Sequence, residues 1–169
     1  MRNAQAEVKY RENYQPSAYL IDSVDLCFDL QDGYTDVSSV LNIRPNPNAE
    51  AGQPLVLDGE HLELLEIGVD GRLLGSDDYQ VASETLTLPA RSEAFQLRTR
   101  VRIKPAENTR LEGLYQSNGM YCTQCEAEGF RSITYYLDRP DVMASFQTTI
   151  IGDSEKYPVM LSNGNATKR

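Results

Sequence analysis

The chain has 169 residues, enough for one domain with its own hydrophobic core. Its 25 acidic residues outnumber 16 basic ones and give a formal net charge of -9 at pH 7, which excludes the basic surface that nucleic-acid binding requires. No apolar run reaches the roughly 18 residues of a membrane span, and the N-terminus lacks the apolar segment of a secretory signal, so we expect a cytoplasmic protein with no membrane partner.

The first half of the chain alternates apolar and polar residues with the two-residue period of β-strands. Val24 to Leu30 is a clear case, and Gln31-Asp32-Gly33 follows it as a turn. The strongest hairpin signal is Asp70-Gly71, which lies between two short apolar runs. Further strands are predicted over residues 37–43, 55–57, 62–69, 79–81, 86–88 and 95–103.

Nothing before Leu111 has the three-and-four apolar spacing of a capped helix. Strands are also predicted over residues 146–150 and 157–161, and Pro140 to Ala144 permits one helical turn because proline suits the first position of a helix. We therefore predict an all-β domain, an antiparallel sandwich or sheet with short helical turns. Ser162 to Asn165 has the composition of a turn that should lead into another strand, so we interpret residues 1–169 as part of a larger protein.

The segment from Gly113 to Pro140 holds two of the three cysteines and four of the ten tyrosines. Cys122 and Cys125 form a C-x-x-C pair, which can be half a zinc site or a redox pair. A structural zinc site needs four ligands, and Cys27 and His61 lie far away in the sequence. A redox pair belongs at the start of a helix, and this setting is β. We expect both cysteines to be reduced and packed as small apolar residues, with no metal bound.

Glu126 and Glu128 flank Ala127, so in an extended chain their carboxylates would share one face. Such a pair can act as acid and base, or it can be a solvated loop edge, and composition alone favours the loop edge. His61 is the only histidine, which leaves no credible Ser-His-Asp or Cys-His arrangement. We predict no catalytic residue in this chain.

Three runs in this segment closely resemble a known family: Gly113 to Ser117, Cys122 to Arg131, and Ile133 to Asp141. The family is the N-terminal domain of bacterial aminopeptidase N, whose members are zinc metallopeptidases that release single residues from peptide N-termini. The resemblance continues from Lys156 to Asn165, and it is weaker in Lys9-Tyr10-Arg11 and from Tyr19 to Leu30.

The resemblance implies a saddle-like β domain that covers a thermolysin-like catalytic domain of the same polypeptide. It also implies that the loop with Gln124 and Glu126 reaches the active site. Glu126 would bind the α-amino group of the peptide substrate, and Gln124 would line the pocket for its first side chain. An α-amine has a pKa of about 7.7–8.0 and is mostly cationic at neutral pH, so a fixed carboxylate selects chain ends.

The zinc motif of that family, His-Glu-x-x-His, and its Gly-Ala-Met-Glu-Asn loop are absent from this sequence. One histidine cannot supply two ligands, so the zinc of the full enzyme would be held outside this chain, and the chain alone is expected to be inactive and to bind no zinc. The resemblance also implies that the domain is cut short at its C-terminal end. The alternative is a stand-alone β-sandwich binding module without catalytic activity.

Overall fold

The structure is a computed structural model that describes residues 10–167. Residues 1–9 and 168–169 lie outside that range, and with them Lys9, where the weaker N-terminal resemblance begins. In the described range the helices are single 3-10 turns: η1 (Arg11–Asn13), η2 (Pro105–Glu107) and η3 (Phe130–Ser132). The strands are β1 (Tyr19–Leu30), β2 (Thr35–Pro45), β3 (Leu55–Asp58), β4 (Glu63–Val69), β5 (Arg72–Leu73), β6 (Gln80–Val81), β7 (Thr85–Leu88), β8 (Phe95–Ile103), β9 (Gly113–Ser117), β10 (Met120–Gln124) and β11 (Ser145–Ile151).

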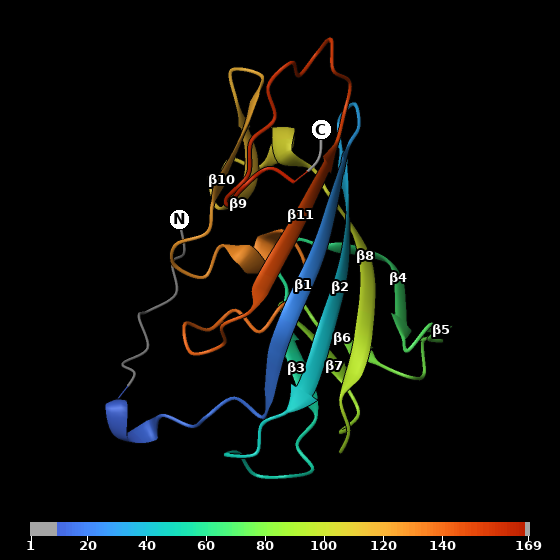
Figure 1. The fold of residues 1–169 in the computed structure, drawn as a ribbon, viewed down its shortest axis with the longest axis vertical. Coiled ribbons are helices and arrows are strands. Elements are labelled where there is room, and N and C mark those ends of the chain that lie inside the picture. The colour runs from blue at the N-terminus through green and yellow to red at the C-terminus, as the bar shows by residue number, and fades with distance from the viewer. Residues whose placement is uncertain (1–9, 168–169) are drawn as a thin grey trace.

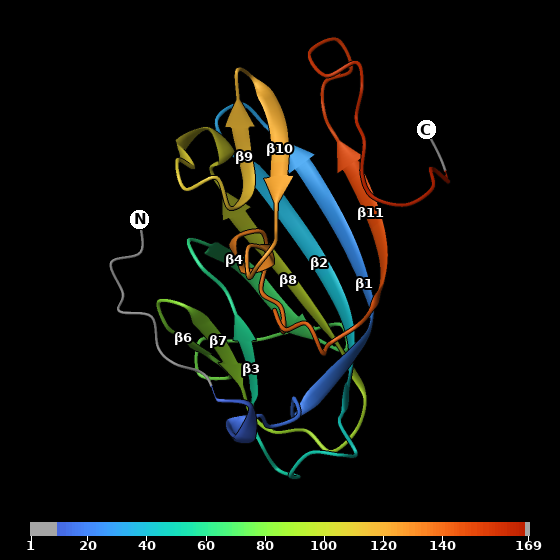
Figure 2. The same cartoon turned by 90° about the vertical axis from the view of Figure 1, so that its left-hand side faces the viewer.

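A six-stranded sheet in the order β11-β1-β2-β8-β4-β5 forms one layer of the molecule (Figure 1). The opposite layer consists of the three-stranded sheet β3-β7-β6 and the β9–β10 hairpin. Figure 2 shows these two pieces over the same face of the large sheet, near its two ends, with the segment that follows β10 between them. The prediction of an all-β domain is confirmed.

The core lies between the two layers because alternate residues of each strand point to one face. In the large sheet, Leu41 of β2 pairs with Leu97 of β8, and both are fully buried. The opposing layer and the segment after η3 supply the other side of the core, with Leu55, Leu57, Leu86, Leu88, Ile133 and Tyr135.

The outer face of the large sheet carries ion pairs between strands. Asp36 of β2, with a side chain only 6% exposed, accepts hydrogen bonds of 2.7 Å from both Arg100 and Arg102 of β8. Hydrogen bonds from Arg102 and then Arg100 hold the pKa of the Asp36 carboxyl below its usual value, against the opposing effect of burial. The Asp36 carboxylate thus links β2 to β8 on the outer face of the large sheet.

Two local predictions were wrong. Residues 157–161 are not a strand, because a strand needs a hydrogen-bonded neighbour and none of the strands described in residues 10–167 pairs with this segment. Pro140 begins a turn rather than a helix, closed by a 3.2 Å hydrogen bond from the Val142 N–H to the Arg139 carbonyl. The predicted antiparallel character is confirmed: among the strands described in residues 10–167, β11 runs parallel to β1, and the other pairings are antiparallel.

Within residues 10–167, no helix is long and apolar enough to span a bilayer.

Candidate functional site

The candidate site is built on the β9–β10 hairpin. Its two turn residues, Asn118 and Gly119, have φ values of 50° and 77°, the backbone that a two-residue hairpin turn requires. The hairpin places Gln124 at the end of β10, opposite Gly113. The sequence prediction treated this stretch as a loop in a β setting. The Asn-Gly pair is the signal that would have revealed the hairpin, just as Asp70-Gly71 revealed the β4–β5 hairpin.

A tight turn over residues 125–129 follows β10 and carries both glutamates. The Glu126–Ala127 peptide bond in it is cis. The turn is closed by a 2.9 Å hydrogen bond from the Gly129 N–H to the Cys125 carbonyl, and Glu128 has a φ of 65°. Because neither the closing hydrogen bond nor this φ is compatible with extended backbone, the expectation that Glu126 and Glu128 share one face of an extended segment is wrong. A turn gives the two carboxylates different surroundings.

Two glycines let the turn close directly onto its neighbours. A Cβ on Gly129 would lie 2.5 Å from the Gln124 carbonyl oxygen and 2.9 Å from the Cys125 Cα. A Cβ on Gly113 would lie 2.8 Å from the Ser132 Cβ. Real Cβ atoms do not approach other atoms so closely, so the end of β10, the turn and η3 are packed as one unit.

Gln124 and Glu126, the two predicted site residues, lie together at the exposed side of this turn. The Gln124 side-chain amide donates a 2.9 Å hydrogen bond to the backbone carbonyl of Glu126. The Glu126 carboxylate has no hydrogen-bond or ion-pair partner within residues 10–167. The Glu126 carboxylate is therefore exposed to solvent without a partner in residues 10–167. The hydrogen bond from Gln124 holds the backbone that carries it.

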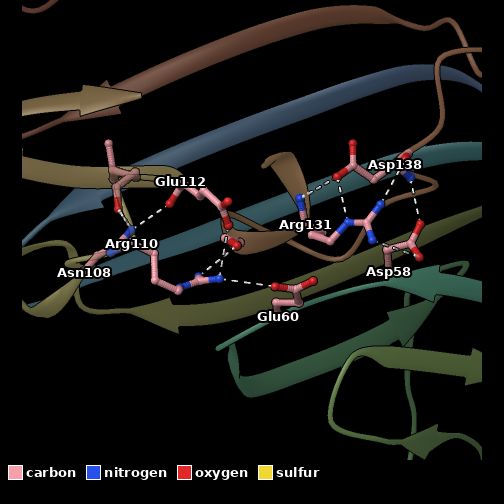
Figure 3. Close-up of polar contacts among 9 residues, drawn as sticks. Asp58, Glu60, Asn108, Arg110, Glu112, Arg131 and Asp138 are labelled. Carbon is pink, nitrogen blue, oxygen red and sulfur yellow. Dashed lines mark hydrogen bonds and ion pairs between the residues drawn. The ribbon is translucent and has the colours of Figure 1, made fainter. Parts of the chain in front are cut away.

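Arg131, which sequence reasoning did not single out, points toward Asp138 and Asp58 (Figure 3). Its guanidinium is only 15% exposed and donates a 3.0 Å hydrogen bond to Asp138. It also lies 4.0 Å from Asp58 and 3.7 Å from the Glu128 carboxylate. Burial alone would lower the pKa of Arg131, but the hydrogen bond to Asp138 and the charges of Asp58 and Asp138 raise it. Arg131 therefore stays charged among three carboxylates.

Backbone contacts fix the segment around Arg131 to the end of β3. The Glu60 N–H donates to the Arg131 carbonyl at 2.9 Å, and the Asp58 and Tyr136 backbones exchange hydrogen bonds of 2.8 and 3.0 Å. The Asp138 N–H in turn donates to the Asp58 carboxylate at 3.0 Å. These partners are far apart in the sequence, so no local sequence pattern indicates their contacts.

Arg110 fixes η3 from the other side (Figure 3). Its guanidinium donates to Glu60 at 3.2 Å and to the Ser132 hydroxyl at 3.1 Å. The Asn108 side chain donates to the Glu112 and Leu114 carbonyls at 2.7 and 2.9 Å, which holds the chain that enters β9. Two arginines thus anchor the single helical turn on which the glutamate-bearing turn rests.

All three cysteines are free in the structure. Cys125 packs against the core as predicted, and burial raises the pKa of its thiol. Cys122 is half-buried in β10. Residues 10–167 contain no group of three or more His, Cys, Asp or Glu side chains placed to hold a metal ion, and His61 is exposed. The donors in the described part of the chain therefore do not fit the zinc that the resemblance implies for the full enzyme.

The family model described as the peptidase M1 N-terminal domain matches residues 12–169. The chain belongs to this family. The resemblance found in the sequence is thereby confirmed. Aminopeptidase N from Caulobacter vibrioides is 46% identical over 153 residues, which cover 90% of this chain and 17% of that protein. Aminopeptidase N from Escherichia coli is 45% identical over 161 residues, which cover 95% of this chain and 18% of that protein.

Solved structures share the fold of this chain. Aminopeptidase A from Legionella pneumophila, solved with aspartic acid, superimposes with a TM-score of 0.86 at 34% identity, over 94% of this chain and 19% of that chain. An M1 zinc metallopeptidase from Deinococcus radiodurans has a TM-score of 0.64 at 16% identity, over 80% of this chain and 33% of that one, and shows the fold alone. The chain thus spans less than a fifth of the length of the curated relatives quoted above.

Proposed function

We propose that this M1 N-terminal domain gates the active site of a zinc aminopeptidase, an enzyme that releases N-terminal amino acids from peptides. The observation that carries the proposal is the Glu126 carboxylate, exposed and without a partner in residues 10–167, on a turn held firmly by its surroundings. The relatives named aminopeptidase N, at 45–46% identity, support the reaction class.

In this proposal Glu126 binds the α-amino group of the peptide. That group is mostly protonated at neutral pH, with a pKa of about 7.7–8.0, and a peptide bond inside a chain carries no such charge. A fixed carboxylate therefore favours substrates with a free N-terminus. Gln124 lies beside Glu126 and contributes to the pocket for the first side chain. A side-chain amide there suits both polar and apolar contacts and adds no charge.

Residues 1–169 are then the N-terminal β domain of a larger polypeptide, whose catalytic domain is the partner and supplies the zinc ligands. The share of the relatives that the chain covers, 17–18%, supports this domain assignment. The alternative, a stand-alone binding module, has no observation in its favour. The downstream coding sequence is the direct test: His-Glu-x-x-His establishes the enzyme, and a stop codon establishes the module.

We also propose a cytoplasmic location, which suits three free thiols in a reducing compartment. Cell fractionation with an antibody to the domain tests this location.

The decisive experiment is Glu126→Gln in the full-length enzyme, since this change keeps the shape and removes the charge. A hydrogen bond to a charged group contributes about 1.5–3 kcal/mol, so kcat/KM for an aminoacyl p-nitroanilide should fall by about 10- to 150-fold. If the catalytic domain supplies a second carboxylate to the same amine, the loss in kcat/KM should lie at the lower end of this range.

Glu128→Gln is the matched control, two residues away. Glu128 is 41% exposed and 3.7 Å from Arg131, and exposed ion pairs contribute only about 0–1 kcal/mol. Its loss in kcat/KM should stay below about fivefold. A silent Glu126→Gln together with a crippling Glu128→Gln would show that the wrong residue was chosen. Two silent variants would rule out the gating role.

A further inference from the structure

We propose that Arg131 is a positioning residue for Glu126: it holds the turn 125–129 in place and makes no contact with the substrate. Because this inference rests on the proposed function, its test is arranged so that the two can fail separately. Arg131 touches three parts of the chain, through Asp58, Asp138 and Glu128.

The contacts of Arg131 join the turn to the end of β3 and to the segment after η3. Asp138 accepts from both the backbone N–H and the guanidinium of Arg131, at 3.2 and 3.0 Å. Asp58 ends β3 and lies 4.0 Å from the guanidinium, and its carboxylate also accepts from the Asp138 N–H. Glu128, within the turn, lies 3.7 Å away. One side chain thus links the turn, the end of β3 and the segment after η3.

The charge balance explains why an arginine stands at this position. Asp138 and Arg131 have side chains only 14% and 15% exposed, so their charges are weakly screened by solvent. Without the guanidinium, Asp58, Asp138 and Glu128 would repel one another around a partly buried space, and Glu128 in the turn is the most exposed of the three. A planar guanidinium can contact several carboxylates at once, which a lysine ammonium cannot do with the same geometry.

Packing transmits this restraint to Glu126. The Gly129 carbonyl accepts from the Ser132 N–H at 3.2 Å, and the Gly129 N–H closes the turn onto Cys125. Since Gly129 has no room for even a Cβ, a shift of η3 displaces the backbone that carries Glu126. Binding groups must be held to well under 1 Å to act fully, so a small displacement is enough to weaken contact with the substrate amine.

The test uses the full-length enzyme with the variants Arg131→Met, Arg131→Lys, Glu126→Gln and the double variant Arg131→Met/Glu126→Gln. Arg44→Met is the matched control, because Arg44 pairs with Asp22 at 2.9 Å on the large sheet, away from the turn. Two measurements are made: kcat/KM with leucine p-nitroanilide, and the inhibition constants of leucine and of 4-methylpentanoate, which is leucine without its amino group.

We expect Arg131→Met to lower kcat/KM by about 10- to 100-fold and to weaken leucine binding, with 4-methylpentanoate binding unchanged. Arg131→Lys should restore only part of the loss. In the Glu126→Gln background, Arg131→Met should cost less than about threefold more, because the contact that it positions is already gone. Arg44→Met should leave these values unchanged.

The inference is overturned if the two single losses multiply in the double variant, or if leucine and 4-methylpentanoate are weakened equally, since both results describe general damage. If Arg131→Met does not fold, Arg131→Lys alone and in the Glu126→Gln background is judged by the same criteria. A Glu126→Gln variant that still discriminates leucine from 4-methylpentanoate as the wild type does refutes the proposed function. A damaged Glu126→Gln beside an unaffected Arg131→Met refutes the role of Arg131 only.

Discussion

At the scale of single residues, Glu126 and Glu128 differ because of Arg131. The Glu128 carboxylate lies 3.7 Å from that guanidinium, whereas the Glu126 carboxylate has no partner in residues 10–167. A cationic ligand approaching the turn therefore meets Glu126 as the uncompensated charge. The local sequence Glu-Ala-Glu does not indicate this difference, because the difference depends on the conformation of the turn and on its contact with Arg131.

Gln124 contacts the Glu126 backbone in the structure and lines the side-chain pocket only in the proposed function, and Gln124→Ala separates the two effects. Loss of its 2.9 Å hydrogen bond to the Glu126 carbonyl should cost about 0.5–1.5 kcal/mol, which lowers kcat/KM by about 2- to 12-fold for all substrates. Loss of its contact with the first side chain should also change the order of preference. A panel of aminoacyl p-nitroanilides in the full-length enzyme measures both effects. An unchanged order of preference would exclude Gln124 from the side-chain pocket.

At the scale of elements, two glycines near the site serve different physical purposes, and a pair of alanine variants distinguishes them. A Cβ added to Gly119 would meet no atom within 4 Å, but the φ of this residue is 77°, so Gly119→Ala should destabilise the domain by about 1–2 kcal/mol through backbone strain alone. Gly129 has an ordinary φ of -89° but no space, so Gly129→Ala should cost about 1–3 kcal/mol through overpacking.

The two variants should then differ in activity. Gly129→Ala must displace the Gln124 and Cys125 backbone, so it should also reduce kcat/KM of the full-length enzyme, whereas Gly119→Ala should not. Guanidinium chloride unfolding and steady-state kinetics measure the two effects. Equal kinetic losses in both variants would mean that the hairpin tip matters as much as the turn.

The ion pair between β2 and β8 predicts a pH dependence of stability. Asp36 has a lowered pKa in the folded protein and a pKa of about 3.9 when unfolded. Its contribution is therefore present above about pH 4 and is lost as the pH falls through the lower, folded value. Asp36→Asn should lose about 1.5–3 kcal/mol of stability at pH 7 and should show a shallower loss on acidification. Parallel acid slopes for wild type and variant would contradict this assignment.

Local pattern predicted the strands of the large sheet well, because alternation in β2 and β8 directly reflects a buried and an exposed face. The β9–β10 hairpin was not predicted, because its strands are only partly buried and Asn118-Gly119 was the one sequence signal for its turn. Residues 157–161 have strand-like composition but lack a ladder partner among the described strands. Gln124 and Glu126 were predicted from the family resemblance. The role of Arg131 could not be predicted, because its partners Asp58 and Asp138 lie 80 residues apart in the sequence.

In the proposed function, the whole domain supplies one half of a site. The turn 125–129 presents the exposed Glu126 carboxylate, and residues 10–167 hold no group of donors placed for a metal ion. The two layers of β-structure place this turn between the hairpin and the three-stranded sheet (Figure 2), where Asp58 and Glu60 at the end of β3 contact the Arg131 segment. The fold thus holds this short turn against the end of β3 and against η3.

The isolated chain should accordingly fold but perform no chemistry. We expect a far-UV circular dichroism spectrum dominated by β-structure, no stoichiometric zinc by elemental analysis, and no hydrolysis of leucine p-nitroanilide. The reason is the ligand shortage: a zinc site needs three or four protein donors, and a C-x-x-C pair with one distant exposed histidine does not supply them. The double variant Cys122→Ser/Cys125→Ser is the matched control and should give the same three results. One tightly held zinc per chain, absent from that control and removable only with unfolding, would establish a structural metal site at the end of β10.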